Sequence, residues 1–185
     1  EGVAAGYGVR SLMYTMANAD KIDKFFWYDF QNDGVDRSYT ENNFGLIDCW
    51  QGPTVPFAAK PGYAAISAFT SVIDGYTYAG QTKLDGAINA FRFTDKTGAR
   101  QDLLVLFTEG TNETVALSAK SGTVLVTDLF GNENRTSGKD VTVSLSDLPV
   151  YLTGDFAEDL TLNKAGFKAD GQYTVPAGGV AQITV

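Results

Sequence analysis

Two stretches decide the fold of the first half of the chain: FFWYDFQNDG at residues 25–34 and KPGYAAISAFTSVIDG at residues 60–75. The first stretch is an apolar aromatic run that opens into a loop of Asn, Asp and Gly, which is typical of a buried strand and the turn after it. The second stretch has apolar residues at helical spacing behind a proline, and residues 3–16 carry a similar helical pattern. Helix, strand, long loop and helix is the alternation of an α/β barrel.

One strand and two helices are too few to close such a barrel. A complete eight-stranded barrel takes about 250 residues, and a fragment of one would leave large apolar faces uncovered. We therefore expect the other strands to come from polypeptide upstream of Glu1, or this segment to pack on another partner. The remainder of the barrel is then the expected partner of residues 1–80.

The chain changes character near residue 80, where short alternating or β-branched runs replace the helical spacing. The runs lie at residues 90–93, 103–108, 114–117, 123–128, 141–145, 150–152 and 180–185. Turn signals separate them, among them Lys96-Thr97-Gly98, Ser121-Gly122 and Gly131-Asn132. The predicted fold class is therefore mainly β: an antiparallel β-sandwich over residues 82–185, preceded by a helix-strand-helix remnant of a (β/α)8 barrel over residues 1–80.

The composition excludes several classes of protein. A formal net charge of -8 without a cluster of Lys or Arg argues against nucleic acid as a partner, because phosphate binding needs concentrated positive charge. No apolar run approaches the roughly 18 residues that cross a bilayer, so no membrane span is expected. The chain has no His, which excludes a Ser-His-Asp triad, and its single Cys49 excludes an internal disulfide.

We expect neither a cofactor nor a metal site. Without His, a zinc site would have to be built from carboxylates. The loop DKTGARQD at residues 95–102 offers too few oxygen ligands at a recognisable spacing for calcium. A neutral or weakly charged ligand suits the composition better than a strongly charged one.

Side chains of a strand alternate between two faces, which divides the aromatic run in two. Trp27 and Asp29 share the face that would point into the barrel. They lie near the carboxyl end of the strand, where enzymes with α/β barrels have their active sites. The other face holds three aromatics that suit burial under the helices: Phe26, Tyr28 and Phe30. The flat indole of Trp27 matches the C–H face of a pyranose, although a core role for Trp27 is open too. Asp29 can accept a hydrogen bond from a sugar hydroxyl or from a neighbouring strand.

Trp50 is a second candidate for contact with sugar. It lies in the loop CWQGP at residues 49–53. Its ring can form an outer sugar contact or fasten the loop to the rest of the protein, and both interpretations stay open.

The order GYGVRSLMYTMANADKIDKFFWYDFQNDG, ENNFGLID and KPGYAAISAFTSVIDG resembles the end of the catalytic barrel in retaining glycoside hydrolases of clan A, the large clan with two catalytic glutamates. The later segments FRFTDKTG, LLVLFTEG, VLVTDLFGNE and LPVYLTGDF resemble the β-sandwich that commonly follows those barrels. The resemblance covers nearly the whole chain and makes residues 1–80 helix 7, strand 8 and helix 8. It implies that Trp27 closes the sugar-binding subsite at the end of the eighth strand, and that Gln31, Asn32 and Asp33 lie near its rim.

The resemblance also implies what this chain lacks. A retaining glycosidase needs an acid/base carboxyl and a nucleophile about 5–5.5 Å apart, and the resemblance puts both glutamates upstream of Glu1. Glu1 itself precedes the first helix, where a carboxylate complements the helix dipole. We therefore expect the C-terminal part of a glycoside hydrolase acting on β-linked oligo- or polysaccharide. It would supply a sugar-stacking Trp27 and an accessory sandwich, with no hydrolysis by this chain alone.

Two other functions stay open for the sandwich. It can be a noncatalytic carbohydrate-binding module, which would show a row of exposed aromatics on one sheet face, or a structural domain that braces the barrel. Absence of such an aromatic strip would favour bracing. A secreted or cell-surface location is favoured, and the triplets at Asn112 and Asn134 fit the N-glycosylation pattern without deciding the compartment.

Overall fold

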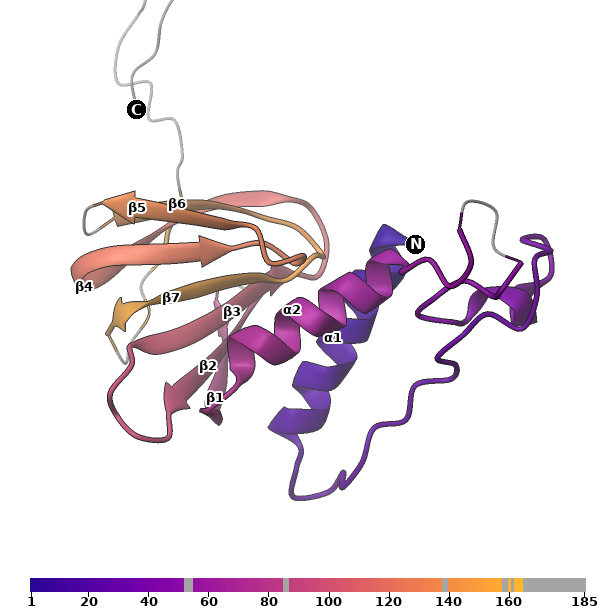
Figure 1. Cartoon of the computed structure of the whole chain (residues 1–185). Coiled ribbons are helices and arrows are strands. Elements are labelled where there is room, and N and C mark those ends of the chain that lie inside the picture. The colour runs from indigo at the N-terminus through magenta and orange to yellow at the C-terminus, as the bar shows by residue number, and fades with distance from the viewer. Residues whose placement is uncertain (52–54, 85–86, 138–139, 158–159, 161, 165–185) are drawn as a thin grey trace, which may run out of the picture.

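A computed structural model describes residues 1–51, 55–84, 87–137, 140–157, 160 and 162–164. Two α-helices, α1 (Gly2–Ala17) and α2 (Pro61–Ile73), flank a short 3-10 helix, η1 (Thr40–Asn43). Eight strands follow: β1 (Tyr76–Leu84), β2 (Ile88–Asp95), β3 (Asp102–Thr108), β4 (Glu113–Thr127), β5 (Glu133–Ser137), β6 (Asp140–Leu145), β7 (Val150–Phe156) and β8 (Leu162–Lys164). Both predicted helices and the mainly β fold class are confirmed (Figure 1).

The two helices form because apolar residues recur on one side of each. The buried positions are four residues apart: Ala5, Val9 and Met13 in α1, and Ala65 and Phe69 in α2. Pro61 opens α2 at a position where the missing N–H of proline costs no helical hydrogen bond. The helices lie side by side along one face of the sheet (Figure 1), so their apolar sides are covered by each other and by the strands.

All eight strands join through antiparallel ladders in the order β1-β2-β3-β7-β4-β5, with β6 and β8 both paired to β4. β4 joins two halves of the sheet, because residues 113–118 pair with β6 whereas residues 123–127 pair with β5. The register shifts around Ser121, between these halves. The sequence predicted a turn at Ser121-Gly122, and the structure has an irregularity inside one strand instead. Gly122 there has a φ of 77°, a conformation that favours glycine.

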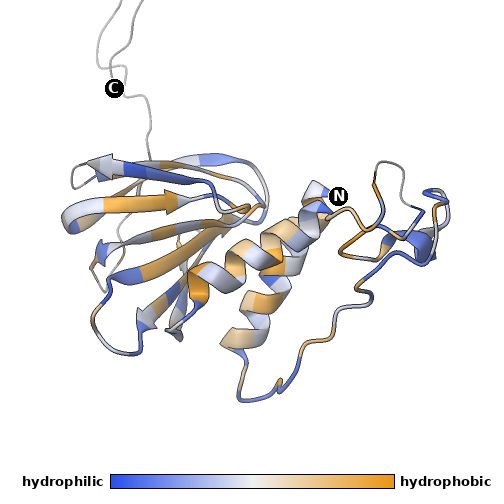
Figure 2. Ribbon diagram, in the orientation of Figure 1, coloured by the Kyte–Doolittle hydropathy of each residue, from blue (hydrophilic) through white to orange (hydrophobic). Residues whose placement is uncertain are grey.

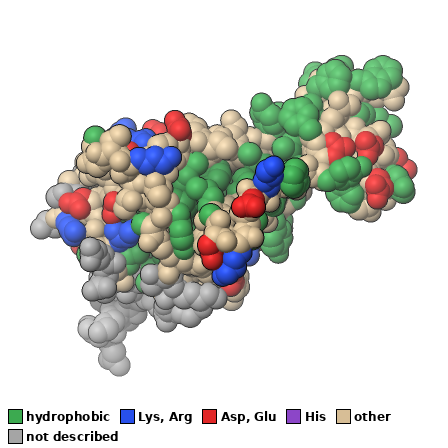
Figure 3. Space-filling model, turned by 90° about the horizontal axis from the view of Figure 1, so that it is seen from below, with side chains coloured by type: hydrophobic (Ala, Val, Ile, Leu, Met, Phe, Trp, Pro, Cys, Tyr) green, Lys and Arg blue, Asp and Glu red, His purple; other side chains and the backbone are tan. Residues whose placement is uncertain are grey.

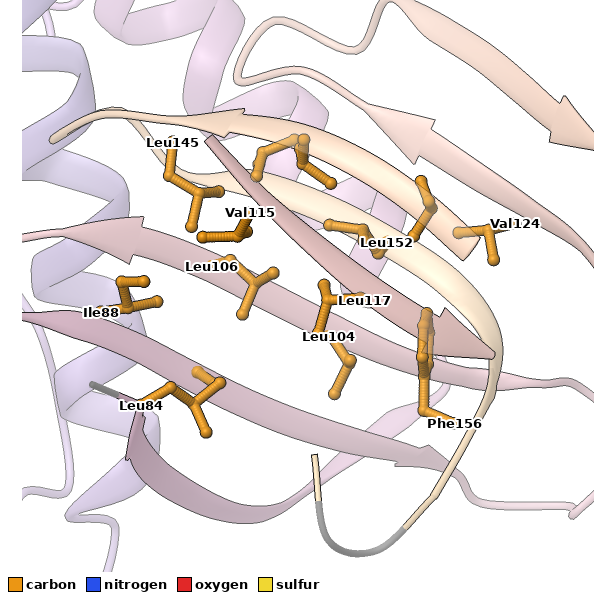
Figure 4. Packing of buried hydrophobic residues seen from close by; sticks show 14 of the residues in the cluster. Leu84, Ile88, Leu104, Leu106, Val115, Leu117, Val124, Leu145, Leu152 and Phe156 are labelled. Carbon is orange, nitrogen blue, oxygen red and sulfur yellow. The ribbon is translucent and has the colours of Figure 1, made fainter. Parts of the chain in front are cut away.

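The first of two cores lies where β6 and the first part of β4 cover one face of β1, β2 and β3 (Figure 4). It is made entirely of aliphatic residues and one Phe, including Leu84, Ile88, Leu104, Leu106, Val115, Leu117, Leu145, Leu152 and Phe156. The second core lies between the opposite face of the sheet and the two helices, and includes Val9, Met13, Phe69, Phe91, Phe93, Val105, Phe107 and Tyr151. Figure 2 shows the hydrophobic residues gathered accordingly in the strands and helices.

β3 contributes to both cores. Leu104 and Leu106 belong to the first core, and Leu103, Val105 and Phe107 belong to the second. All five side chains are fully buried. Because neither face of β3 meets water, its sequence is a continuous apolar run and not the alternation expected of a strand with one wet face.

Most predicted strands lie where the sequence placed them. The runs at residues 90–93, 103–108, 141–145 and 150–152 fall in β2, β3, β6 and β7. The runs at residues 114–117 and 123–128 are two parts of β4, and the run at residues 180–185 lies outside the described residues. The sequence patterns did not predict β1, β5 and β8. The division of the chain into domains at residues 80–82 stays a prediction.

Residues 25–30 differ from the expected strand. Between the two helices the β pairing of the described residues is limited to isolated bridges, from Ile47 to Gln31 and to Ala59. A regular strand needs neighbours that take its backbone hydrogen bonds, and within the described chain no strand lies beside residues 25–30. The face expected under the helices is the exposed one, since Phe26 is 83% exposed whereas Trp27 is partly buried.

Candidate functional site

A pocket of about 150 Å³ lies where the start of α1, the aromatic segment and the start of α2 meet. Its lining includes Glu1, Ala4, Trp27, Phe44, Lys60 and Gly62. Two helix starts and a loop therefore surround a largely apolar space with one acidic and one basic group at its edge. The pocket is smaller than a typical small-ligand site of roughly 300–1,000 Å³, and like such a site it has an apolar lining with a few placed polar groups.

Trp27 is held in this pocket from two sides. Its indole Nε1 donates a hydrogen bond to the carbonyl oxygen of Phe44 at 3.1 Å. The ring edge lies against α1 at Gly8, where a Cβ atom would be 2.8 Å from Trp27 Cζ3. The absence of a side chain on Gly8 is what lets the indole approach the helix so closely.

The segment that receives the indole is itself fastened on both sides of Phe44. Lys60 Nζ donates to the carbonyl oxygen of Asn43 at 2.7 Å, and the backbone N–H of Gly45 donates to Asn32 Oδ1 at 2.9 Å. The backbone N–H of Lys60 also donates to the carbonyl oxygen of Leu46 at 3.0 Å. These contacts leave no room for a side chain at Gly45, whose Cβ would lie 2.2 Å from the backbone nitrogen of Asn32.

Three polar side chains next to the pocket are buried: Asn32, Asp48 and Lys60. Asn32 Nδ2 donates to Asp48 Oδ1 at 3.0 Å, and Lys60 Nζ donates to Asn32 Oδ1 at 3.1 Å. Buried polar groups need such partners, because an unpaired one carries the full cost of leaving water. The Asn32 side chain therefore uses both ends of its amide inside the protein.

Two acidic and two basic groups balance around this cluster. Arg37 lies 3.3 Å from Glu1 and 3.9 Å from Asp48, and Lys60 Nζ lies 3.9 Å from Glu1 Oε1. Glu1 occupies the N-cap position of α1 without a side-chain capping hydrogen bond. Its carboxylate is thus near both the positive end of the helix and two cations, in keeping with an electrostatic role there.

The other predicted site residues have different surroundings. Asp29 Oδ1 accepts a hydrogen bond from the backbone N–H of Gln31 at 2.7 Å, a local turn that uses the carboxylate. Gln31 is partly buried and forms the bridge to Ile47. Trp50 is 63% exposed and does not line the pocket. The structure therefore places Trp27 at the pocket and Asn32 behind it, and does not bring Trp50 to the same place.

One phenol at the pocket is perturbed by its neighbours. The Asp33 carboxylate raises the pKa of Tyr28 by its charge and accepts a hydrogen bond from the Tyr28 hydroxyl at 3.3 Å. The Tyr28 phenol therefore stays protonated to a higher pH than an ordinary phenol, and its hydroxyl hydrogen is engaged by Asp33.

Sequence patterns missed the residues that hold the pocket together. The KP pair at residues 60–61 predicts only a helix start. No local signal marks a lysine as buried, because its burial depends on Asn32 and Asn43, which come from earlier in the chain.

No group of three or more His, Cys, Asp or Glu residues in the described part of the chain is arranged to hold a metal ion. Among the helices of that same part, none has the length and apolar character needed to cross a membrane.

The fold of the chain is similar to a portion of a glycoside hydrolase. A similar solved structure is that of a family 39 glycoside hydrolase from the gut symbiont Bacteroides cellulosilyticus WH2. It matches this chain with a TM-score of 0.66 and 27% sequence identity. The match covers 82% of this chain and 30% of that chain, so this chain spans less than a third of the length of that protein. No family model and no curated protein matches the sequence.

Proposed function

We propose that this chain is the C-terminal part of a glycoside hydrolase that acts on β-linked oligo- or polysaccharide. In this proposal Trp27 stacks on a sugar ring, and the catalytic glutamates come from upstream polypeptide. Residues 1–80 are the end of a (β/α)8 barrel and residues 82–185 are the accessory sandwich. The observation that carries the proposal is the pocket beside Trp27, in a chain that is similar to a portion of a family 39 glycoside hydrolase.

Trp27 suits a sugar contact because it combines a fixed ring with an adjacent hollow. Its N–H bond to Phe44 and its contact with Gly8 hold the indole, and the pocket beside it has more apolar than polar surface. An aromatic face of this kind packs against the C–H groups of a pyranose. Glu1 at the pocket edge can accept hydrogen bonds from sugar hydroxyls.

Exposed aromatic side chains support the remainder of the barrel as a partner. They gather in residues 25–57 and include Phe26, Tyr28, Phe30, Tyr39, Trp50 and Phe57. Figure 3 shows the corresponding concentration of hydrophobic side chains on the part of the molecule that projects away from the sheet. Exposed apolar side chains gathered in one part of a molecule mark a place where another part of a protein packs, as expected of a barrel strand and loop without their neighbours.

For the sandwich, bracing is favoured over an independent carbohydrate-binding role. Among the described residues from β1 onward, Phe130 is the one large aromatic that is exposed. Phe91, Phe93, Phe107 and Phe156 are buried in the two cores. Phe167 and Tyr173 lie outside the described residues. The described strands therefore offer no row of aromatics for a sugar.

The test is a binding and activity comparison between the chain, Trp27→Ala and Trp50→Ala. Calorimetry with β-1,4-linked tetrasaccharides of glucose and of xylose gives the affinity, and a panel of aryl β-glycosides gives the activity. We expect Trp27→Ala to lower the affinity by about twofold to tenfold, since aromatic stacking contributes roughly 0.5–1.5 kcal/mol beyond area burial. Trp50→Ala is the matched control and is expected to leave the affinity unchanged.

None of the three proteins is expected to cleave the glycosides. Cleavage by the 185-residue chain would contradict the proposal that both catalytic glutamates lie upstream. Equal affinity of Trp27→Ala and the unaltered chain would contradict the role of Trp27.

A further inference from the structure

The indole of Trp27 is held by the carbonyl group of Phe44, a residue of the loop between the two helices. The position of this carbonyl group depends on how the backbone around it is fixed. Trp27 Nε1 donates to the Phe44 oxygen at 3.1 Å. The two residues next to Phe44 are fixed by side chains from elsewhere: the Asn43 carbonyl by Lys60 and the Gly45 N–H by Asn32. The peptide group that receives the indole is thus bracketed on both sides.

We infer that Asn32 and Lys60 are positioning residues that set the orientation of the Trp27 indole through the backbone of residues 43–45. The inference rests on the proposed function in one respect, that the orientation of Trp27 matters because a sugar stacks on it. Asn32 is then a buried residue that supports the loop behind the pocket, and not a residue at the rim of the sugar-binding subsite. Lys60, which the sequence predicts only as part of a helix start, then also fixes the backbone of the loop.

The geometry of the three side chains supports this role over a direct contact of Asn32 with a ligand. Asn32 Oδ1 accepts from the Gly45 N–H at 2.9 Å and from Lys60 Nζ at 3.1 Å, and Asn32 Nδ2 donates to Asp48 at 3.0 Å. Asn32 does not line the pocket. An amide with both ends engaged and its residue buried has little capacity left for a sugar hydroxyl.

Lys60 connects the pocket to the rigid part of the molecule. It is the N-cap residue of α2, whose Ala65 and Phe69 are buried in the second core. From that place it binds the loop twice, through its backbone N–H to Leu46 and through its ammonium to Asn43. The sheet therefore holds α2, α2 presents Lys60, and Lys60 holds the loop that orients the indole.

The test reads the indole directly. In a Trp50→Phe background, Trp27 gives the single indole N–H signal in a ¹H–¹⁵N correlation spectrum, because the chain has two Trp residues. Lys60→Met keeps the length of the side chain and removes the ammonium. Lys96→Met, at an exposed position in the turn after β2, makes the same change of charge away from the pocket. Circular dichroism confirms that each variant is folded.

We expect the Trp27 indole signal to shift and its hydrogen exchange to accelerate in Lys60→Met and to stay unchanged in Lys96→Met. The same affinity measurement with β-1,4-linked tetrasaccharides should weaken roughly fivefold in Lys60→Met, the effect of losing about one hydrogen bond of net worth near 1 kcal/mol. Should Lys60→Met fail to fold, Asn32→Ser is the second variant, because it withdraws the acceptor from Gly45 and keeps a polar group.

An unchanged indole signal in a folded Lys60→Met or Asn32→Ser protein would overturn the inference. Failure of the proposed function is distinguishable from this result. If the unaltered chain binds none of the saccharides, the sugar-stacking proposal fails, and the indole signal of the variants still decides whether Asn32 and Lys60 position Trp27.

Discussion

Gly8 of α1 and Trp27 are in contact: a Cβ atom on Gly8 would lie 2.8 Å from Cζ3 and 3.1 Å from Cη2 of the indole. The helix thus offers bare backbone to the ring of the residue proposed to stack on sugar. Because this contact depends on the absence of a single methyl group, it gives a direct way to move the indole without changing any polar group.

Gly8→Ala is expected to displace the Trp27 ring and to change its fluorescence. The methyl group would stand closer to the ring carbon than van der Waals contact allows, so the ring has to shift. The measurement is the emission maximum and acrylamide quenching of Trp27 in a Trp50→Phe background. Gly2→Ala is the matched control, because a Cβ there meets nothing within 4 Å. An identical emission spectrum in the two Gly→Ala variants would show that the contact is absent in solution.

Tyr151→Phe is expected to leave the protein as stable as before or more stable by about 1 kcal/mol. The Tyr151 hydroxyl is buried and has no hydrogen-bond partner among the described residues. Removing a buried polar group that lacks a partner removes a desolvation cost. Urea unfolding gives the free energy, with Tyr39→Phe, an exposed tyrosine, as the control. A loss of more than about 1 kcal/mol in Tyr151→Phe would mean that the hydroxyl has a partner in solution.

The same tyrosine predicts a loss of stability in alkali. Burial, with a smaller contribution from the charge of Asp128, raises the pKa of Tyr151 well above the ordinary value near 10. A raised pKa in the folded state means that stability is complete below pH 10 and falls as the pH rises above it. The free energy of unfolding measured between pH 9 and pH 11 should therefore fall, and it should fall less steeply in Tyr151→Phe. Parallel curves for the two proteins would contradict this.

Asp95 predicts the opposite dependence in acid. A hydrogen bond from the Thr97 hydroxyl, together with bonds from the backbone N–H groups of Ala99 and Arg100 and from the Arg100 guanidinium, lowers the pKa of Asp95 well below its usual range. Stability from this carboxylate is therefore present above about pH 4 and is lost as the pH falls below that value.

The measurement for Asp95 is the melting temperature of the unaltered chain and of Asp95→Asn between pH 6 and pH 3. The curve of Asp95→Asn should be flatter, because the neutral amide does not titrate in this pH range. Asp20→Asn, at an exposed carboxylate after α1, should keep the slope of the unaltered chain. Equal slopes for all three would rule out the assigned role of the turn at residues 95–100.

Leu104→Ala is expected to lower the free energy of unfolding by about 2–5 kcal/mol. Leu104 is fully buried in the first core, between β3 and the strands that cover it (Figure 4). Truncation leaves a cavity that its neighbours can fill only in part. Urea unfolding of Leu104→Ala and of Thr142→Ala, an exposed position on β6, provides the comparison. A change below about 1 kcal/mol would mean that the first core is loosely packed.

The parts of the fold that depend on local pattern could be predicted from the sequence. Apolar residues at helical spacing over residues 3–16 predicted α1, and the run at residues 103–108 predicted a strand of the sandwich. The pairing of β7 between β3 and β4 could not be predicted, because strand order depends on contacts between segments far apart in the chain.

The candidate site shows the same limit. Trp27 could be singled out, because the alternation of side chains along a strand puts it on the face expected to point into the barrel. Its contacts could not, because Gly8 and the Phe44 carbonyl carry no chemical signal in a sequence. The expected strand at residues 25–30 is not formed among the described residues, for a related reason. A strand is defined by its neighbours, and the described residues supply none beside it.

The side chains of β3 from Leu103 to Phe107 have no contact with solvent, and this determines the order in which parts of the molecule can unfold. Its amide groups pair with β2 on one side and β7 on the other, while its side chains are divided between the two cores. Detachment of the helices bares one side of the strand and leaves its ladders intact, and opening of β6 bares the other side with the same result. Amide protons of β3 should therefore be the last to exchange with solvent, released only when both cores are lost together.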